Sequence, residues 1–204
     1  MAQQKYKNPS DVANSILSNR FIDLNQEGNE EDQLLDELEE FSLNKWNLNP
    51  REKRAIDEYT SDSKPINDYL RGKTRHNERN DKIISDLDNA IKRFELKNNL
   101  KVYRASDDSL IKDKNVGDVV QDNAFLSTTP FKNSLADYRA KWGGNYKPYT
   151  YIINIPKGAG RGAYLPYYSH FGFTENEFLL NRNNKYKISN IDKDKIYLDL
   201  LEEK

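Results

Sequence analysis

The stretch Phe173-Thr174-Glu175-Asn176-Glu177-Phe178-Leu179-Leu180 decides how this chain is interpreted, because two carboxylates stand directly before an apolar run. The apolar run is typical of a strand that enters a core. On an extended chain Glu175 and Glu177 point to the same side. Like charges held so close are costly unless a cation, a hydrogen-bond network or a substrate requires them. The pair is therefore either two solvated glutamates at a strand end or part of a functional site.

The part of the chain before position 99 has the periodicity of helices. Asn49-Pro50-Arg51-Glu52 is a strong helix start, because it combines an N-cap residue, a proline at the first helical position and a capping-box glutamate. Apolar residues also recur at helical spacing over 34–41, 63–72 and 83–97. Residues 73–81 are polar and are expected to form a loop.

Beyond position 99 the apolar pattern becomes alternating, which indicates strands. Strands are expected at 100–104, 117–120, 124–130, 149–155, 178–180, 185–188 and 195–201. Helices followed by strands, with few crossover units, predict an α+β fold and not a doubly wound one.

Three polar side chains occupy positions that need an explanation. Arg104 shares a strand face with Leu100 and Val102, so it faces inward and needs a partner or a cleft. Asn67 and Arg71 are four residues apart and share a helix face. They are either surface residues or a pair of donors aimed at an anion.

Composition excludes several classes of protein. The 204 residues carry a formal net charge of −1, which argues against binding to nucleic acid through bulk charge. There is no cysteine, and the two histidines, His76 and His170, lack metal-ligand spacing, so no metal site is expected. No run approaches the ~20 apolar residues of a membrane span. Residues 1–10 lack an apolar run, so no signal peptide is expected.

The motifs of the chain, taken together, resemble those of a known family. They match, in order and spacing, the arginine–serine–glutamate class of mono-ADP-ribosyltransferase toxins, most of all the enzymatic component of the clostridial and bacillar binary actin-modifying toxins. These motifs are Tyr59-Thr60, Pro65-Ile66-Asn67-Asp68-Tyr69-Leu70-Arg71, Val102-Tyr103-Arg104, Phe125-Leu126-Ser127-Thr128-Thr129, Ile155-Pro156-Lys157-Gly158 and Glu175-Asn176-Glu177-Phe178-Leu179-Leu180. The resemblance implies N-terminal helices packed on a two-sheet mixed β core, with residues 49–204 as catalytic domain and residues 1–48 as a helical extension.

The resemblance also implies a reaction in which NAD is the substrate and no metal takes part. Glu177 is expected to stabilise positive charge on the ribose, and Ser127 to hold Glu177 by a hydrogen bond. Arg104 and Arg71 are expected to bind the diphosphate. Asn67 is expected to contact the same dinucleotide. Tyr59 is expected either to pack near NAD or to be a core tyrosine.

In the family, the residue type at the position of Glu175 correlates with the residue that accepts ADP-ribose. A glutamate at this position implies that the acceptor is an arginine of a target protein. Actin is the first candidate target. The resemblance further implies secretion or injection into a target cell. Residues 1–48 are expected to be either a docking segment for a translocation partner or extra helices packed on the catalytic domain.

The chain departs from the family pattern at three places. Thr129 replaces a serine but keeps the hydroxyl. The family's target-contacting aromatic position is Gly172 here, so Phe171 or Phe173 is expected to take over substrate recognition. The loop 142–148 has other residues than the relatives, so its contacts to NAD are not assigned.

Two alternatives remain open on the sequence. One is an NAD glycohydrolase that consumes NAD without a protein target. The other is a non-catalytic interaction module, for which the acidic helix over 30–40 would be the docking surface.

Overall fold

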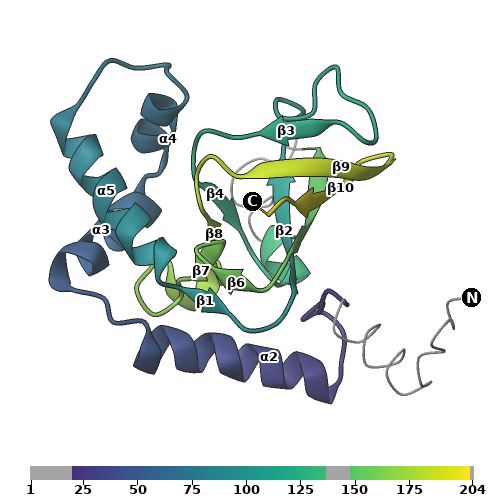
Figure 1. The fold of residues 1–204 in the computed structure, drawn as a ribbon, viewed down its shortest axis with the longest axis horizontal. Coiled ribbons are helices and arrows are strands. Elements are labelled where there is room, and N and C mark those ends of the chain that lie inside the picture. Colours follow the sequence, from purple (N-terminus) through teal and green to yellow (C-terminus); the bar gives the residue numbers. More distant parts are fainter. Residues whose placement is uncertain (1–19, 137–147, 203–204) are drawn as a thin grey trace, which may run out of the picture.

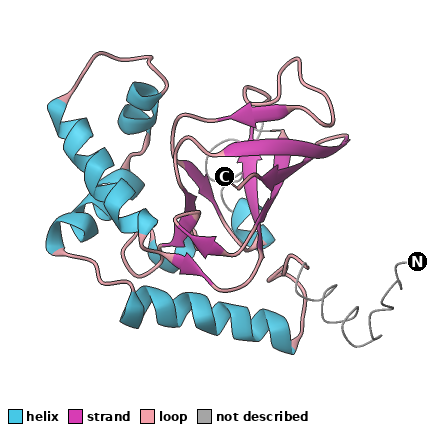
Figure 2. Cartoon of the chain, in the orientation of Figure 1, coloured by secondary structure: helices cyan, strands magenta, loops and turns pink. Residues whose placement is uncertain are grey.

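The computed structural model describes residues 20–136 and 148–202 (Figure 1). The helices come first in the chain and lie along one side and the lower edge of the strands (Figure 2). They are α2 (Asn29–Glu40), the π-helical turn η1 (Phe41–Lys45), α3 (Pro50–Ser61), α4 (Lys64–Leu70) and α5 (Glu78–Lys92). A further helical stretch covers 132–136.

The start of α3 confirms the capping box predicted from the sequence. The Asn49 side chain accepts hydrogen bonds from the backbone N–H groups of Arg51 and Glu52, and Glu52 accepts one from the Asn49 N–H. The expected loop 73–81 is wrong at its end, because Asn77 caps α5 and the helix begins at Glu78.

The expected end of the long helix near 97 is also wrong. Helix α5 ends at Lys92, and β1 (Glu95–Leu96) then pairs with β6 (Gly158–Ala159) in a two-stranded antiparallel sheet. This pairing joins segments more than 60 residues apart, so local periodicity did not reveal it.

Two larger sheets carry the remaining strands. The five-stranded sheet has the order β2-β5-β10-β9-β3, in which β5 and β10 are parallel and the other neighbours antiparallel. Its strands are β2 (Leu100–Ser106), β3 (Val119–Gln121), β5 (Tyr149–Ile155), β9 (Lys185–Asp192) and β10 (Lys195–Leu200). The three-stranded sheet has the order β4-β8-β7, formed by β4 (Leu126–Thr128), β7 (Gly162–Tyr164) and β8 (Phe178–Leu180). The predicted α+β fold with a mixed β core is confirmed.

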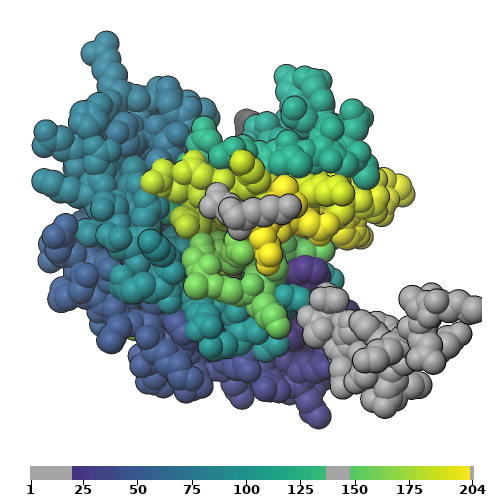
Figure 3. Space-filling model, in the orientation of Figure 1, coloured from purple at the N-terminus to yellow at the C-terminus, as the bar shows by residue number. Residues whose placement is uncertain are grey.

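One hydrophobic core joins the helices to both larger sheets. Leu34, Leu38 and Trp46, which precede α3, are buried in the same cluster as residues of α3, α5 and the strands. The indole Nε1 of Trp46 also donates to the carbonyl oxygen of Ala90 on α5 (2.8 Å). The space-filling view shows α2 packed along the lower border of the molecule, against the segments above it (Figure 3).

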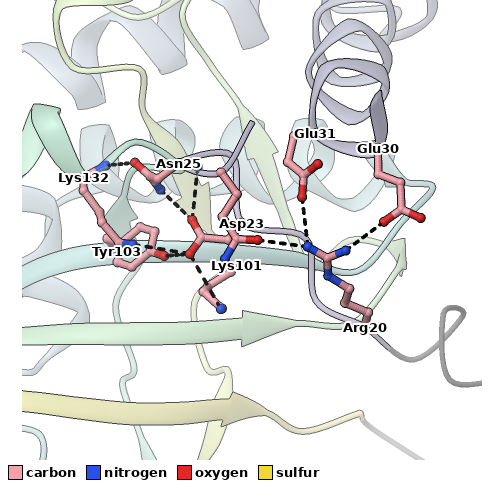
Figure 4. A network of polar contacts seen from close by, with 9 residues as sticks. Arg20, Asp23, Asn25, Glu30, Glu31, Lys101, Tyr103 and Lys132 are labelled. Atoms are coloured by element: carbon pink, nitrogen blue, oxygen red, sulfur yellow. Dashed lines mark hydrogen bonds and ion pairs between the residues drawn. The ribbon is translucent and has the colours of Figure 1, made fainter. Parts of the chain in front are cut away.

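Residues 20–25 are fastened to the edge of the five-stranded sheet. Ile22 N donates to Asn99 O (3.0 Å) and Lys101 N donates to Ile22 O (2.9 Å), so residue 22 continues the sheet beside β2. Arg20 forms ion pairs with Glu30 (3.2 Å) and Glu31 (3.0 Å) of α2 (Figure 4). The segment therefore connects the first turn of α2 to β2.

The centre of this attachment is the buried carboxylate of Asp23 (Figure 4). It accepts hydrogen bonds from the hydroxyl of Tyr103 (2.5 Å) and the amide Nδ2 of Asn25 (2.7 Å), and it lies 3.4 Å from Lys132 Nζ. Asn25 in turn donates to Pro130 O (3.0 Å) and accepts from Lys132 N (2.7 Å). Together they hold the helical stretch 132–136 against β2.

Asp23→Asn is expected to lower the free energy of unfolding at pH 7 by about 1–3 kcal/mol, because it weakens a buried charge-assisted network. Burial acts to raise the pKa of Asp23, but the hydrogen bonds from Tyr103 and Asn25 outweigh it and hold the pKa below its ordinary value. A carboxyl with a lowered folded-state pKa contributes stability above its unfolded pKa and loses it as pH falls through the folded pKa.

The measurement is urea denaturation of wild type and Asp23→Asn at pH 7 and near pH 3. The difference is expected to shrink at the acidic pH. Asp36→Asn, at an exposed position of α2, is the matched control and is expected to change stability by less than about 0.5 kcal/mol. An equal deficit for Asp23→Asn at both pH values would contradict the expectation.

Candidate functional site

A cavity of about 490 Å³ opens between the end of α3, α4, strands β2 and β4, and the turn before β8. This volume falls within the range of about 300–1,000 Å³ typical of ligand pockets. Eight of the nine residues selected from the sequence line it: Tyr59, Asn67, Arg71, Arg104, Ser127, Phe171, Glu175 and Glu177. The ninth, Phe173, lies outside the lining, is 50% exposed and packs edge-on against Tyr167 with ring centroids 5.0 Å apart.

Glu177 is the buried carboxylate of the cavity, with 3% of the residue exposed. It directly precedes β8, whose register places Leu179 opposite Ser127 on β4. The Ser127 hydroxyl donates a hydrogen bond to Glu177 Oε1. The pairing of two strands thus brings together residues 50 positions apart.

The environment of Glu177 holds its pKa at about 7. Burial is the main cause, since it penalises the charged form, and the negative charge of Glu175 adds to it. The hydrogen bond from Ser127 and the positive charge of Arg104 act in the opposite direction. Near neutral pH this carboxyl is therefore poised between its two protonation states.

The two glutamates do not lie on a strand, so the expected extended conformation is wrong, although both side chains line the same cavity. A 3₁₀ turn (Gly172–Thr174) leads into Glu175, which has φ −100° and ψ −21°, and Asn176 adopts φ 46°. Asparagine tolerates this left-handed conformation. Its side chain is fixed on both sides, by donation to Phe173 O (2.8 Å) and acceptance from the Tyr164 hydroxyl (3.1 Å). The tight turn, not the pleat of a strand, brings both carboxylates to the cavity.

Arg104 faces the cavity from β2, as its position in the strand predicted. Its Nη1 donates to the Ser127 carbonyl oxygen (2.7 Å). Its Nε is buried and has no hydrogen-bond partner among the described residues. A buried donor in this state is costly, so the site is suited to an acceptor supplied by a ligand.

Asn67 reaches the cavity from the middle of α4, and Arg71 reaches it from the C-cap of the same helix. The Asn67 amide Nδ2 donates to the Tyr59 hydroxyl (3.1 Å), and Tyr59 itself is fully buried, with its ring edge-on to Phe125 at 5.5 Å. Tyr59 is therefore a core residue whose hydroxyl contacts Asn67. Arg71 binds Asp122 through two hydrogen bonds, Nε to Oδ1 (3.1 Å) and Nη2 to Oδ2 (2.6 Å).

Sequence reasoning missed the contact that attaches the loop before Glu175 to α3. The Thr60 hydroxyl accepts a hydrogen bond from the His170 backbone N–H (2.8 Å) and donates to the Ile56 carbonyl oxygen (2.9 Å). His170 Nδ1 also lies 3.4 Å from Asp57 Oδ1. Thr60 stood in a recognised motif, but nothing in the sequence indicated its partner 110 positions away.

Within residues 20–136 and 148–202, no three or more His, Asp or Glu side chains are grouped as metal ligands would be. In the same ranges no helix combines the length and apolar character that crossing a bilayer requires. Trp142, Tyr146 and Lys147, of the loop whose contacts were left unassigned, lie outside the described residues.

Comparison with known proteins identifies the family of this chain. A model of the family described as ADP-ribosyltransferase exoenzyme matches residues 37–202. The chain belongs to the ADP-ribosyltransferase exoenzyme family. The family predicted from the motifs is thereby confirmed, and all nine residues selected from the sequence fall within the matched range.

Among curated proteins, the chain is 34% identical over 158 residues to the NAD(+)--arginine ADP-ribosyltransferase EFV of Enterococcus faecalis. The match covers 72% of the chain and 31% of that relative, so the chain spans about a third of the relative's length.

Solved structures share the fold of the chain. Plx2a, an ADP-ribosyltransferase toxin from Paenibacillus larvae, matches with a TM-score of 0.69 and 26% identity, over 84% of this chain and 96% of that one. The enzymatic component C2-I of the Clostridium botulinum C2 toxin matches with a TM-score of 0.63 and 21% identity, over 80% of this chain and 46% of that one.

Proposed function

We propose that this chain binds NAD in the cavity and transfers ADP-ribose from it to an arginine side chain of a target protein, with release of nicotinamide. The observation that carries the proposal is the buried Glu177, which is hydrogen-bonded to Ser127 and shares one cavity with Arg104 and Glu175. The name of the Enterococcus faecalis relative, which includes both NAD and arginine, supports the same donor and acceptor.

In the proposed reaction the bond between the ribose anomeric carbon and the nicotinamide nitrogen breaks. Its electron pair stays with nicotinamide, which leaves as a neutral molecule, and positive charge develops on the ribose. The Glu177 carboxylate stabilises this charge where it forms, which lowers the barrier more than it favours the ground state. Ser127 is the positioning residue that holds this carboxylate in place.

Arg104 and Arg71 are the proposed contacts to the diphosphate. A guanidinium is permanently charged and can donate two parallel hydrogen bonds to phosphate oxygens. The buried Nε of Arg104, without a partner among the described residues, fits an acceptor brought by the dinucleotide. Asn67, held by the Tyr59 hydroxyl, supplies a further polar contact at the same wall.

Glu175 is the proposed contact to the acceptor. It lines the cavity beside Glu177, and a second carboxylate there can orient an incoming guanidinium and take up the proton that the attacking nitrogen loses. Phe171 at the cavity and Phe173 on the outside of the same turn are the proposed contacts to the target protein.

The proposal also covers the target protein and the route of delivery. Actin is the first target to test, and secretion or injection into a target cell is the proposed route. Residues 49–204 contain every residue proposed here for the reaction. In the described part of residues 1–48, Leu34, Leu38 and Trp46 are buried in the common core, which supports a role as helices packed on the catalytic domain. Docking to a translocation partner is the other role proposed for this extension.

The test of this function is a parallel assay of nicotinamide release and of label transfer from NAD labelled in its ADP-ribose part. Transfer is measured to a small guanidino compound and to actin. Release that does not depend on any acceptor and produces no labelled protein would favour an NAD glycohydrolase. A folded protein that does not bind NAD in calorimetry would favour the non-catalytic module.

Thr60→Val is expected to reduce ADP-ribose transfer by about tenfold or more while nicotinamide release changes little. The hydroxyl of Thr60 accepts the hydrogen bond of the His170 N–H, and without it the loop that carries Phe171 and Glu175 keeps only the contact of His170 with Asp57 as a side-chain link to α3. Misplacing a reacting group by about 1 Å can lower the reaction rate by as much as about 10²-fold. The two rates are measured in the same preparation.

Thr60→Ser keeps the hydroxyl and is the matched control, expected to behave like the wild type in both rates. Equal losses of transfer and release in Thr60→Val would show that the attachment serves the fold as a whole and not the acceptor side of the site.

A further inference from the structure

The ion pair between Arg71 and Asp122 connects the end of α4 to the segment that follows β3. Two parallel hydrogen bonds form it, and the side chains are 30% and 12% exposed, respectively. Figure 1 shows α4 beside the end of β3 from which the chain turns toward β4. Asp122 is not among the described residues that line the cavity, whereas Arg71 is.

Asp122 is itself fixed before it contacts Arg71. Its Oδ1 accepts a hydrogen bond from the Ala124 backbone N–H (3.0 Å), two residues further along the chain. The carboxylate is therefore held by the backbone of the segment that leads into β4. Arg71, at the other end of the pair, continues the helical hydrogen bonding of α4, because its N–H donates to Asn67 O (3.0 Å).

The geometry leaves part of the guanidinium available to a ligand. Asp122 accepts one hydrogen bond from Nε and one from Nη2. An arginine has five N–H donors, so the two of Nη1 and the second of Nη2 are not used by Asp122. A long arginine side chain that is ordered only when a ligand arrives lowers the affinity, because its rotamer freedom is lost on binding. A side chain already held in one orientation avoids that loss.

We propose that Asp122 is a positioning residue for NAD binding, which holds the Arg71 guanidinium in the orientation that receives the diphosphate. This inference rests on the proposed function. It adds a residue that does not touch the dinucleotide and that lies outside the motifs of the sequence.

The chain offers a matched control for this pair. Arg182 and Asp88 form a second two-pronged ion pair, with Nε to Oδ1 at 2.9 Å and Nη2 to Oδ2 at 2.8 Å. Arg182 is 32% exposed, close to the 30% of Arg71, and Asp88 is 30% exposed, more than the 12% of Asp122. Neither residue lines the cavity. Asp88→Asn therefore removes an equivalent interaction at a site away from the proposed chemistry.

The experiment measures the Kd for NAD by calorimetry, and KM and kcat for nicotinamide release without acceptor, in wild type, Asp122→Asn and Asp88→Asn. Asp122→Asn is expected to raise Kd and KM by about two- to tenfold, the range that corresponds to ordering one long side chain, with kcat unchanged within about twofold. Asp88→Asn is expected to leave all three constants unchanged. Should Asp122→Asn not fold, Asp122→Glu, which keeps the charge but shifts Arg71, carries the same expectation.

A double-variant comparison shows whether Asp122 acts through Arg71. Arg71→Ala and Arg71→Ala/Asp122→Ala are expected to bind NAD with the same Kd, because Asp122 has nothing left to orient. A further loss in the double variant would overturn the inference. Unchanged or tighter binding by Asp122→Asn would also overturn it, the latter because Asp122 would then compete with the diphosphate for Arg71.

The inference and the proposed function fail in different ways. A folded wild-type protein that does not bind NAD contradicts both. Wild-type binding and turnover, together with an Asp122→Asn variant of wild-type affinity, contradict only the role of Asp122.

Discussion

Glu177→Gln is expected to reduce both nicotinamide release and ADP-ribose transfer by at least about 10²–10³-fold, while the protein remains folded. Glutamine has nearly the same shape and can still accept the hydrogen bond from Ser127, but it carries no charge to stabilise the ribose cation. Both activities depend on the same bond cleavage, so they are expected to fall together. Parallel rate measurements with NAD binding by calorimetry check the result.

The same variant is expected to be more stable than the wild type above pH 7. A carboxyl whose folded-state pKa is raised binds more protons in the native than in the unfolded state, so its contribution to stability falls as pH rises from the unfolded pKa to the folded one. For Glu177, whose pKa lies at about 7, the cost above that pH is on the order of 3 kcal/mol. Glutamine removes this cost, so the stability gain should be large at pH 8 and small near pH 4.

Wild-type nicotinamide release is expected to rise with pH through a midpoint near 7, because only the ionised carboxylate stabilises the cation. Glu27→Gln, at an exposed position before α2, is the matched control and should leave rate and stability unchanged. Substantial activity of Glu177→Gln would remove the assignment of this residue, and with it the observation that carries the proposed function.

Glu175→Gln is expected to lower transfer to a guanidino acceptor by about 10²-fold or more, while nicotinamide release without acceptor stays within a few-fold of the wild type. The carboxylate at this position is proposed to take the proton from the attacking nitrogen, and general-base catalysis contributes typically about 10²–10⁴-fold. Glutamine keeps the size of the side chain but accepts no proton. Both rates are to be measured at saturating NAD.

A second measurement on this variant tests the electrostatic link between the glutamates. The charge of Glu175 contributes to the raised pKa of Glu177, so its removal should shift the pH midpoint of nicotinamide release to lower pH. Equal loss of transfer and release, with an unshifted midpoint, would mean that Glu175 supports the site as a whole and does not select the acceptor step.

Much of the fold follows from local chemistry. The capping box at Asn49 and the apolar runs of β5 and β8 depend on neighbours within a few residues, and the structure places these elements at the predicted positions. The errors occur where partners are distant. The pairing of β1 with β6 ends the long helix early, and the turn at Asn176 replaces the expected strand conformation of the two glutamates.

The candidate site likewise has residues that the sequence predicted and contacts that depend on distant partners. The ordered motifs led to eight of the residues that line the cavity, since the spacing of Arg104, Ser127 and Glu177 is a property of the chain alone. The contacts of Thr60 and Asp122 were not predicted, because their partners His170 and Arg71 stand 110 and 51 positions away. Hydroxyl and carboxylate side chains are common on surfaces, so their types alone indicated no role.

The sequence by itself determined the fold class, the family and the identity of the two carboxylates, because periodicity, capping and motif order are written along the chain. Only the tertiary structure decided how those carboxylates differ. The register of β8 beside β4 buries Glu177 against Ser127, and the turn at Asn176 leaves Glu175 partly exposed at the mouth of the same cavity. Burial and neighbouring charge set the pKa of a carboxyl, and both depend on segments that meet only when the chain folds.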